Sequence, residues 1–289
     1  MLLGYSRQAY YQAKNYEQRQ FYEEELVIIE VLKHRELLKH LGTRKLLLKL
    51  KAFLQDHQFT IGRDGLFNLL RENSLLVRKR KRKGCITTFS KHSFRKYPNI
   101  SKGFIPSAPN QLWVCDITYI HIGNGFGYLS IITDQYSHKI VGFCLYKTLE
   151  TKGPLSALKM AIEGAGSIKR LIHHSDRGVQ YCCGDYVKIL NNKKIEISMT
   201  EKGDPLENPV AERVNGILKM ELLEKAYSNF SVAQVAIAKA ISIYNYYRPH
   251  NSINDLTPIE AHQMSEAIPK RWKNYYQSKQ QKQQTDGID

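Results

Sequence analysis

Apolar segments separated by short polar connections between residues 112 and 146 predict a β-meander. Three segments rich in Ile, Val, Tyr and Leu cover residues 112–122, 127–133 and 139–146. The connections between them, 123–125 and 134–138, are short and rich in turn-forming residues. Short polar connections between apolar strands favour hairpins, so we expect three consecutive antiparallel strands.

A helical pattern follows the meander and leads into a fourth strand. Apolar residues recur at helical spacing within residues 150–164, and residues 168–174 then have the composition of a strand. A strand that follows a crossover helix tends to join its sheet in parallel, which places 168–174 beside 112–122. The pattern therefore predicts an α/β fold with a mixed sheet.

The first 77 residues are predicted to be helical. Apolar residues recur at helical spacing over residues 22–38, about 43–54 and about 63–73. Two short helices joined by a tight polar turn are typical of a helix-turn-helix unit, and the alternative is a small helical bundle that only stabilises the core. The residues expected to face inward in the first and third helices are Leu26, Ile29, Leu32, Leu37, Leu66, Phe67, Leu69 and Leu70.

Basic residues point to a polyanionic partner. The formal net charge is +16 and the pI is about 9.5, which makes association with nucleic acid the natural expectation. Off the apolar face of the third helix, Arg63, Asn68 and Arg71 are candidate DNA contacts. Six consecutive cations follow in an expected extended linker over 78–105, and they are further candidates: Arg78, Lys79, Arg80, Lys81, Arg82 and Lys83.

Several other classes of protein fit poorly. No run of about 18 apolar residues and no signal-peptide pattern is present, so we expect a cytoplasmic protein without a membrane partner. Five cysteines, an odd number, do not make a disulfide framework. The pair His173-His174 lacks the Cys or His partners of a zinc site, and Cys115 is expected to be a small core residue on the strand face opposite Asp116.

Three acidic residues form the candidate catalytic site. Asp116 follows the apolar run 112–115, and Asp176 follows the predicted strand 168–174, so both are expected near the ends of neighbouring strands. Glu212 lies in a helical pattern over about 207–224. Carboxylates are the ligands that two Mg²⁺ ions need for in-line phosphoryl transfer.

The helix that contains Glu212 has a polar side and an apolar side. At about 100° per residue, Asn208, Asn215 and Lys219 lie on the same side as Glu212, and Lys219 is expected to contact a DNA phosphate. Asn208 has two open assignments, which are a contact to the metal shell or a phosphate and a cap on the helix. An ordinary surface helix would also segregate its residues in this way.

Four further residues are candidate DNA contacts. His174 and Gln180 flank Asp176, which makes them candidates for DNA or the metal shell. Arg248 and His250 end a predicted helix over 232–244 and could contact DNA, although a turn packed on the core is the favoured alternative.

These motifs resemble the OrfB transposases of bacterial insertion sequences, whose catalytic core is similar to retroviral integrase. Thirty-five residues separate Asp176 from Glu212, as in the family's D,D(35)E signature, and Lys219 matches a basic residue seven positions after the glutamate. The segments that carry the resemblance are Trp113-Val114-Cys115-Asp116-Ile117-Thr118-Tyr119, His174-Ser175-Asp176-Arg177-Gly178-Val179-Gln180-Tyr181, Gly203-Asp204-Pro205-Leu206-Glu207-Asn208-Pro209-Val210-Ala211-Glu212, Tyr244-Asn245 and Arg248-Pro249-His250.

The resemblance implies a fold and an activity. The fold is an RNase H-like core with a five-stranded mixed sheet flanked by helices, over residues 106–268, preceded by the helix-turn-helix region and followed by a flexible tail over 269–289. The activity is DNA cleavage and strand transfer at Asp116, Asp176 and Glu212, with two Mg²⁺ ions for which Mn²⁺ can substitute. The implied partners are the element's terminal repeats, target DNA, further copies of the chain in a dimer or higher oligomer at the nucleoid, and an OrfA protein or fusion.

Two alternative functions remain open at this point. A catalytically silent DNA-binding repressor would use the helical unit and the basic linker but not the acidic residues. An RNase H-like nuclease that only hydrolyses would use the acidic residues but not the N-terminal unit.

Overall fold

The computed structural model describes residues 6–77, 92–166, 168–201 and 207–269. The chain divides into two compact units, one over residues 1–84 with Met220–Leu222 and the other over the remaining residues. The predicted linker cations 78–83 and the tail from residue 270 lie outside the described residues. Among the described residues, no helix is long and apolar enough to cross a membrane.

The N-terminal unit contains three helices, as predicted. They are α1 (Arg7–Leu37), α2 (Thr43–Asp56) and α3 (Arg63–Glu72), with Ser6 capping α1 through a hydrogen bond from Ala9 N. Helix α1 begins fifteen residues before the expected start. The residues buried in this unit include Val27, Val31, Leu46, Leu50, Leu66 and Leu70.

Part of the predicted inward face of this unit is wrong. Ile29, Leu32, Leu37 and Phe67 are exposed. Helix α1 is apolar on two sides, so periodicity alone could not select the side that packs.

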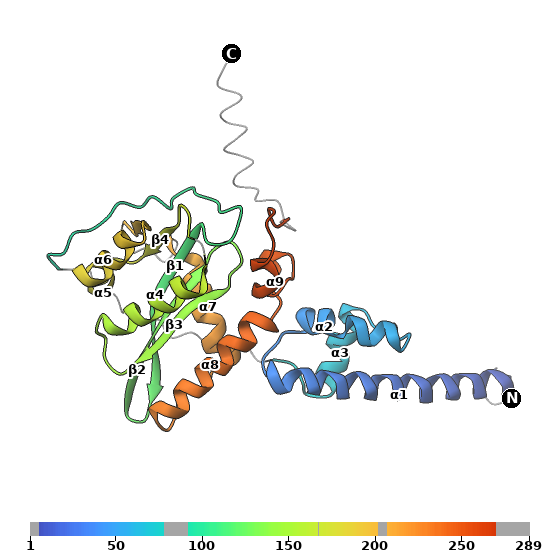
Figure 1. Cartoon of the computed structure of the whole chain (residues 1–289). Coiled ribbons are helices and arrows are strands. Elements are labelled where there is room, and N and C mark those ends of the chain that lie inside the picture. Colours follow the sequence, from blue (N-terminus) through green and yellow to red (C-terminus); the bar gives the residue numbers. More distant parts are fainter. Residues whose placement is uncertain (1–5, 78–91, 167, 202–206, 270–289) are drawn as a thin grey trace, which may run out of the picture. The chain divides into compact units, whose positions relative to one another are not determined.

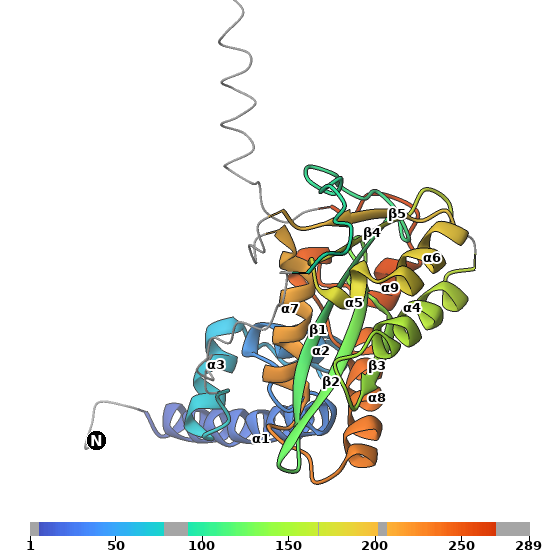
Figure 2. The same cartoon turned by 90° about the vertical axis from the view of Figure 1, so that its left-hand side faces the viewer.

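The second unit is built on a five-stranded mixed sheet (Figures 1 and 2). The strand order is β3-β2-β1-β4-β5. Strand β2 pairs antiparallel with β1 and β3, while β4 pairs in parallel with β1 and β5, so the predicted meander and parallel neighbour are confirmed. The strands are β1 (Leu112–Ile122), β2 (Gly125–Asp134), β3 (Ile140–Tyr146), β4 (Ile172–Ser175) and β5 (Glu196–Met199).

Helices cover both faces of the sheet. Helix α4 (Lys152–Gly164) packs on β2 and β3, and α7 (Pro209–Ile217) packs on the opposite face against β1 and β2 (Figure 2). Helix α4 approaches so closely that a Cβ on Gly142 would lie 2.1 Å from Ala157 O. The remaining helices are α5 (Val179–Cys182), α6 (Gly184–Asn192), α8 (Phe230–Tyr246) and α9 (Pro258–His262).

The alternation of β1 determines which side chains face which helix layer. Trp113 and Cys115 join the core under α4 and α6, whereas Leu112 and Val114 join a smaller core with Ala211 of α7. Because successive side chains of a strand point to opposite faces, Asp116 faces the α7 side. The predicted position of Cys115 in the core, away from Asp116, is confirmed.

Candidate active site

The structure brings Asp116 and Asp176 together on neighbouring parallel strands. Val114 of β1 is the register partner of His174 of β4, and Asp176 directly follows the last residue of β4. The expectation that Asp116 lies near a strand end is wrong, because β1 continues to Ile122. Asp116 lies where its parallel neighbour β4 stops.

Asp116 has two hydrogen-bond donors and an excess of negative charge around it. Ile117 N donates to Oδ1 at 2.9 Å and Asn215 Nδ2 donates to Oδ2 at 2.7 Å. Burial and the neighbouring charge of Asp176 nevertheless raise the pKa of Asp116 to about 7, and Glu212 adds a smaller contribution in the same direction. A carboxylate in this setting is stabilised by any cation that binds beside it.

The loop after Asp176 is shaped around its carboxylate. Gly178 N donates to Asp176 Oδ1 at 3.0 Å. A Cβ at Gly178 would lie 3.0 Å from that oxygen and 3.0 Å from Gln180 Oε1, which explains the glycine. Gln180 is buried and its Nε2 donates to Leu149 O at 3.0 Å, so its amide orders the loop from inside the fold.

Two asparagines of the α7 segment form hydrogen bonds to β1. Asn208 Nδ2 donates to Cys115 O at 2.9 Å, and Asn215 donates to Asp116 as described above. Asn208 occupies the N-cap position of α7, but its side chain makes no capping bond. The capping role is therefore wrong, and the observed bond to Cys115 O anchors the helix that contains Glu212. The repeat of Asn at positions −4 and +3 from Glu212 was the signal in the sequence.

The side-chain carbonyl oxygens of these two asparagines are buried and make no hydrogen bond within the described residues. Both Asn208 and Asn215 are buried, and within the described part of the chain Oδ1 of each has no hydrogen-bond partner. A buried acceptor without a partner costs roughly 1–3 kcal/mol. Such groups are tolerated most readily beside a site that binds a ligand.

Glu212 lies in the first turn of α7 and is exposed. Within the described residues, no three His, Cys, Asp or Glu side chains are grouped closely enough to hold a metal ion. The aspartates are therefore preassembled as a pair, and the glutamate faces solvent on the adjoining helix. Paired carboxylates with one raised pKa are a donor set that suits a divalent cation with oxygen ligands.

A buried His and Cys lie behind Asp116. Cys115 Sγ is 3.2 Å from His173 Nε2, and Tyr186 Oη is 2.9 Å from the same nitrogen. Burial lowers the pKa of His173 to about 3 and raises the pKa of the Cys115 thiol. Both groups are neutral, so this cluster provides neither a thiolate nucleophile nor a zinc site.

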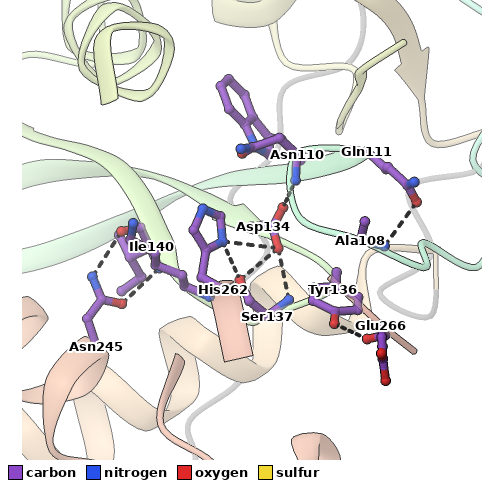
Figure 3. Close-up of polar contacts among 12 residues, drawn as sticks. Ala108, Asn110, Gln111, Asp134, Tyr136, Ser137, Ile140, Asn245, His262 and Glu266 are labelled. Carbon is purple, nitrogen blue, oxygen red and sulfur yellow. Dashed lines mark hydrogen bonds and ion pairs between the residues drawn. The ribbon is translucent and has the colours of Figure 1, made fainter. Parts of the chain in front are cut away.

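A second polar cluster surrounds Asp134 at the end of β2 (Figure 3). Asp134 Oδ1 accepts from Ser137 N at 2.8 Å and Ser137 Oγ at 2.7 Å, and Oδ2 accepts from Asn110 N at 2.7 Å. His262 Nδ1 lies 2.9 Å from Ser137 Oγ and 3.7 Å from Asp134 Oδ1. The composition is that of a hydrolase triad, but the serine donates to the aspartate instead of being activated by the histidine. The cluster joins the β2–β3 turn to the C-terminal segment.

The other predicted site residues divide into buried and exposed groups. His174 is buried, with Nδ1 2.8 Å from Ser198 Oγ, and burial lowers its pKa. Arg248 is 0% exposed and its Nη1 donates to Pro249 O at 3.3 Å, beside the buried His250. For this turn the geometry favours the packed alternative over a DNA contact, because a guanidinium with no exposed surface cannot reach a phosphate.

The predicted site residues that are exposed lie on α3 and on the short helix that follows α7. Lys219 is exposed in a π-helical segment, Leu218–Leu222, that replaces the predicted continuation of α7. On α3, Arg63 pairs with Asp64 and Arg71 Nη1 donates to Asn68 Oδ1 at 2.8 Å.

Comparisons with known proteins identify the family of this domain. Two models described as the integrase core domain match residues 106–205 and 193–258. The fold and the carboxylate pair therefore define an RNase H-like, integrase-type core. Among solved structures, the catalytic core domain of HTLV-2 integrase in complex with magnesium has a TM-score of 0.44 at 21% identity, covering 54% of this chain and 98% of that one.

Relatives from bacteria define the family more narrowly. An uncharacterized 31 kDa protein of insertion element IS600 from Shigella sonnei is 36% identical over 78% of this chain and 83% of its own length. A putative transposase of IS986/IS6110 from Mycobacterium tuberculosis is 33% identical over 56% of this chain and 60% of its own. Transposase InsF of IS3A from Escherichia coli is 28% identical over 62% and 64%. The chain belongs to the insertion-sequence transposases with an integrase core domain, and it is a DNA transposase.

Proposed function

We propose that this transposase cuts the ends of its own insertion sequence and transfers them to target DNA at a site formed by Asp116, Asp176 and Glu212. The observation that supports the proposal most strongly is the Asp116 carboxylate, which lies beside Asp176 and has a pKa of about 7. Among the described residues, no cation contributes to the shift of this pKa, and DNA bound with divalent cations would supply positive charge.

The three carboxylates would hold two Mg²⁺ ions, for which Mn²⁺ can substitute. Paired divalent ions increase the basicity of the attacking oxygen and stabilise the leaving oxygen of a phosphodiester. Asp116 and Asp176 provide the fixed part of this site, and Glu212 completes it from α7. Asn208 and Asn215 keep α7 against β1, so they set how far Glu212 is from the aspartates.

DNA recognition is proposed for exposed basic residues. Arg63, Asn68 and Arg71 of α3 would contact the element end in a helix-turn-helix mode, and Lys219 would contact a phosphate near the cut. The run 78–83 would bind the backbone without regard to sequence. Replacing Lys79 and Lys81 by alanine should flatten the salt dependence of DNA binding, since each lost phosphate contact lowers the slope by about one. If the salt dependence of DNA binding is unchanged, residues 78–83 do not contact the DNA.

The partners follow from the need to handle two DNA ends together. We propose a dimer or higher oligomer on DNA at the bacterial nucleoid, acting with an OrfA protein or as a fusion to one.

One assay separates the proposal from its two alternatives. The protein is incubated with a labelled duplex of the element end, a target duplex and Mg²⁺, and the products are resolved on a denaturing gel. Joined products support the transposase proposal. Nicks without joining indicate a nuclease that only hydrolyses, and a mobility shift without nicks indicates a silent DNA-binding protein.

A further inference from the structure

Helix α1 has an apolar side that its own unit leaves uncovered. Val27 and Val31 face the unit's core and are buried. Eight large apolar side chains of the same helix are exposed to solvent. Tyr16 and Leu37 lie on other sides of the helix, and the remaining six form the exposed set: Tyr10, Tyr11, Phe21, Tyr22, Ile29 and Leu32. A helix with apolar residues on two sides is typically one that packs against two partners.

The exposed set forms one stripe. At about 100° per residue, its six members fall within an arc of roughly 120° on the side opposite Val27 and Val31. The stripe extends over most of the 31 residues of α1. Scattered apolar residues on a surface need no explanation, but a contiguous stripe of this length does.

The charges within the stripe are ordered along the helix. Arg7 and Lys14 lie in its N-terminal half, and Glu25 and Glu36 lie in its C-terminal half. The stripe is therefore apolar in the middle, positive towards one end and negative towards the other. Such a surface is complementary to itself when it is turned end over end.

We propose that α1 binds α1 of a second copy of this chain in an antiparallel pair. With the two-fold axis between Phe21 and Tyr22, Arg7 faces the partner's Glu36 and Tyr11 faces the partner's Leu32. A parallel pair would instead set Arg7 against the partner's Arg7, and like charges in register are unfavourable. The antiparallel pair is a closed two-fold dimer in which both copies use the same surface. This inference concerns self-association without DNA and does not depend on the proposed chemistry.

The first test is the mass of the full chain in solution. Sedimentation velocity without DNA should give a dimer that dissociates on dilution. Phe21→Glu places a charge at the centre of the stripe and should weaken the dimer by about tenfold or more. Tyr16→Glu is the matched control, because Tyr16 and Phe21 are each 69% exposed on the same helix but Tyr16 lies outside the stripe. A monomeric wild type, or equal effects of the two substitutions, would overturn the proposal.

The second test fixes the direction of the pair. Arg7→Glu and Glu36→Arg should each weaken the dimer, because each sets like charges against one another in the antiparallel register. The double variant restores opposite charges and should regain wild-type association. Single variants without effect, or a double variant that is not restored, would contradict the antiparallel arrangement.

Discussion

Two aspartates on neighbouring strands of the same sheet have opposite surroundings. Asp134 of β2 is fully buried, and Ser137 N, Ser137 Oγ and Asn110 N all donate to it. Asp116 of β1 has two donors, but its nearest charged neighbours are Asp176 and Glu212. The fold surrounds Asp134 with hydrogen-bond donors, whereas Asp116 lies among other carboxylates and has a pKa of about 7.

The difference separates a structural acid from a functional one. Burial by itself does not mark a catalytic group, because a buried carboxylate with enough donors only stabilises the fold. A carboxylate placed beside other carboxylates costs stability unless a cation binds there. The sheet tolerates that cost at Asp116, which supports the assignment of Asp116 to the catalytic site.

The largest expected effect is loss of DNA cleavage in Asp116→Asn. Removing the charge should reduce the rate of cutting roughly thousandfold or more, on the order of 4 kcal/mol of transition-state stabilisation. Glu212→Gln should act in the same direction. The measurement is nicking of a labelled element-end duplex, with binding of the same duplex as the control. Cutting that survives in either variant would remove that residue from the site.

Asp134→Ala should damage stability instead of chemistry. The donors of Ser137 and Asn110 would lose their acceptor inside the fold, which should lower the free energy of unfolding by about 3 kcal/mol. Urea denaturation measures this change, and the cutting rate per folded molecule should stay close to wild type. Asp116→Asn in the same denaturation experiment should show no such loss. Equal destabilisation of the two variants would contradict the assignment of a structural role to Asp134 and a catalytic role to Asp116.

The pH dependence of stability should report the raised pKa of Asp116. In the unfolded chain Asp116 loses its proton near 3.8, whereas the folded protein keeps that proton until about pH 7. Between these values the folded state binds more protons, so the free energy of unfolding attributable to Asp116 falls as pH rises and levels off above about 7. Comparing the wild type with Asp116→Asn across this range isolates that contribution. Parallel curves for the two proteins would contradict the raised pKa.

A smaller effect is expected from Asn215→Ala. Its amide orients the Asp116 carboxylate, and loss of such a contact typically costs about 10–100-fold in metal affinity or activity. The Mg²⁺ concentration needed for half-maximal cutting should rise, while DNA binding is unchanged. Asn208→Ala removes a bond to backbone instead of to Asp116, so it should disturb the Mg²⁺ dependence less. If the two variants require equal Mg²⁺, Asn215 acts only through the position of α7.

The parts of the fold predicted from sequence are those with long regular patterns. Strands β1, β2 and β3 have seven or more residues each and are rich in apolar and aromatic residues, so their composition and the turn residues between them identified them. Strands β4 and β5 have four residues each. The start of β4 was placed too early, and β5 was expected only from the family resemblance. A four-residue strand contains too few alternations to be distinguished from a loop.

The candidate site was predictable for a different reason. Asp116, Asp176 and Glu212 were identified by motif, and the structure adds the contacts of Asn208 and Asn215. The Asp134 cluster was missed because its partners Asn110 and His262 are distant in sequence and ordinary in composition. Arg248 and His250 were candidate DNA contacts with a turn packed on the core as the favoured alternative, and both side chains are buried.

Binding of Mn²⁺ to the protein without DNA tests the central claim most directly. Titration calorimetry should show Mn²⁺ binding to the wild type and to the folded Asp134→Asn variant, and none to Asp116→Asn. Binding should also raise the thermal stability of the wild type above pH 7, where Asp116 is ionised. Undiminished Mn²⁺ binding by Asp116→Asn would contradict the assignment of Asp116 as a metal ligand.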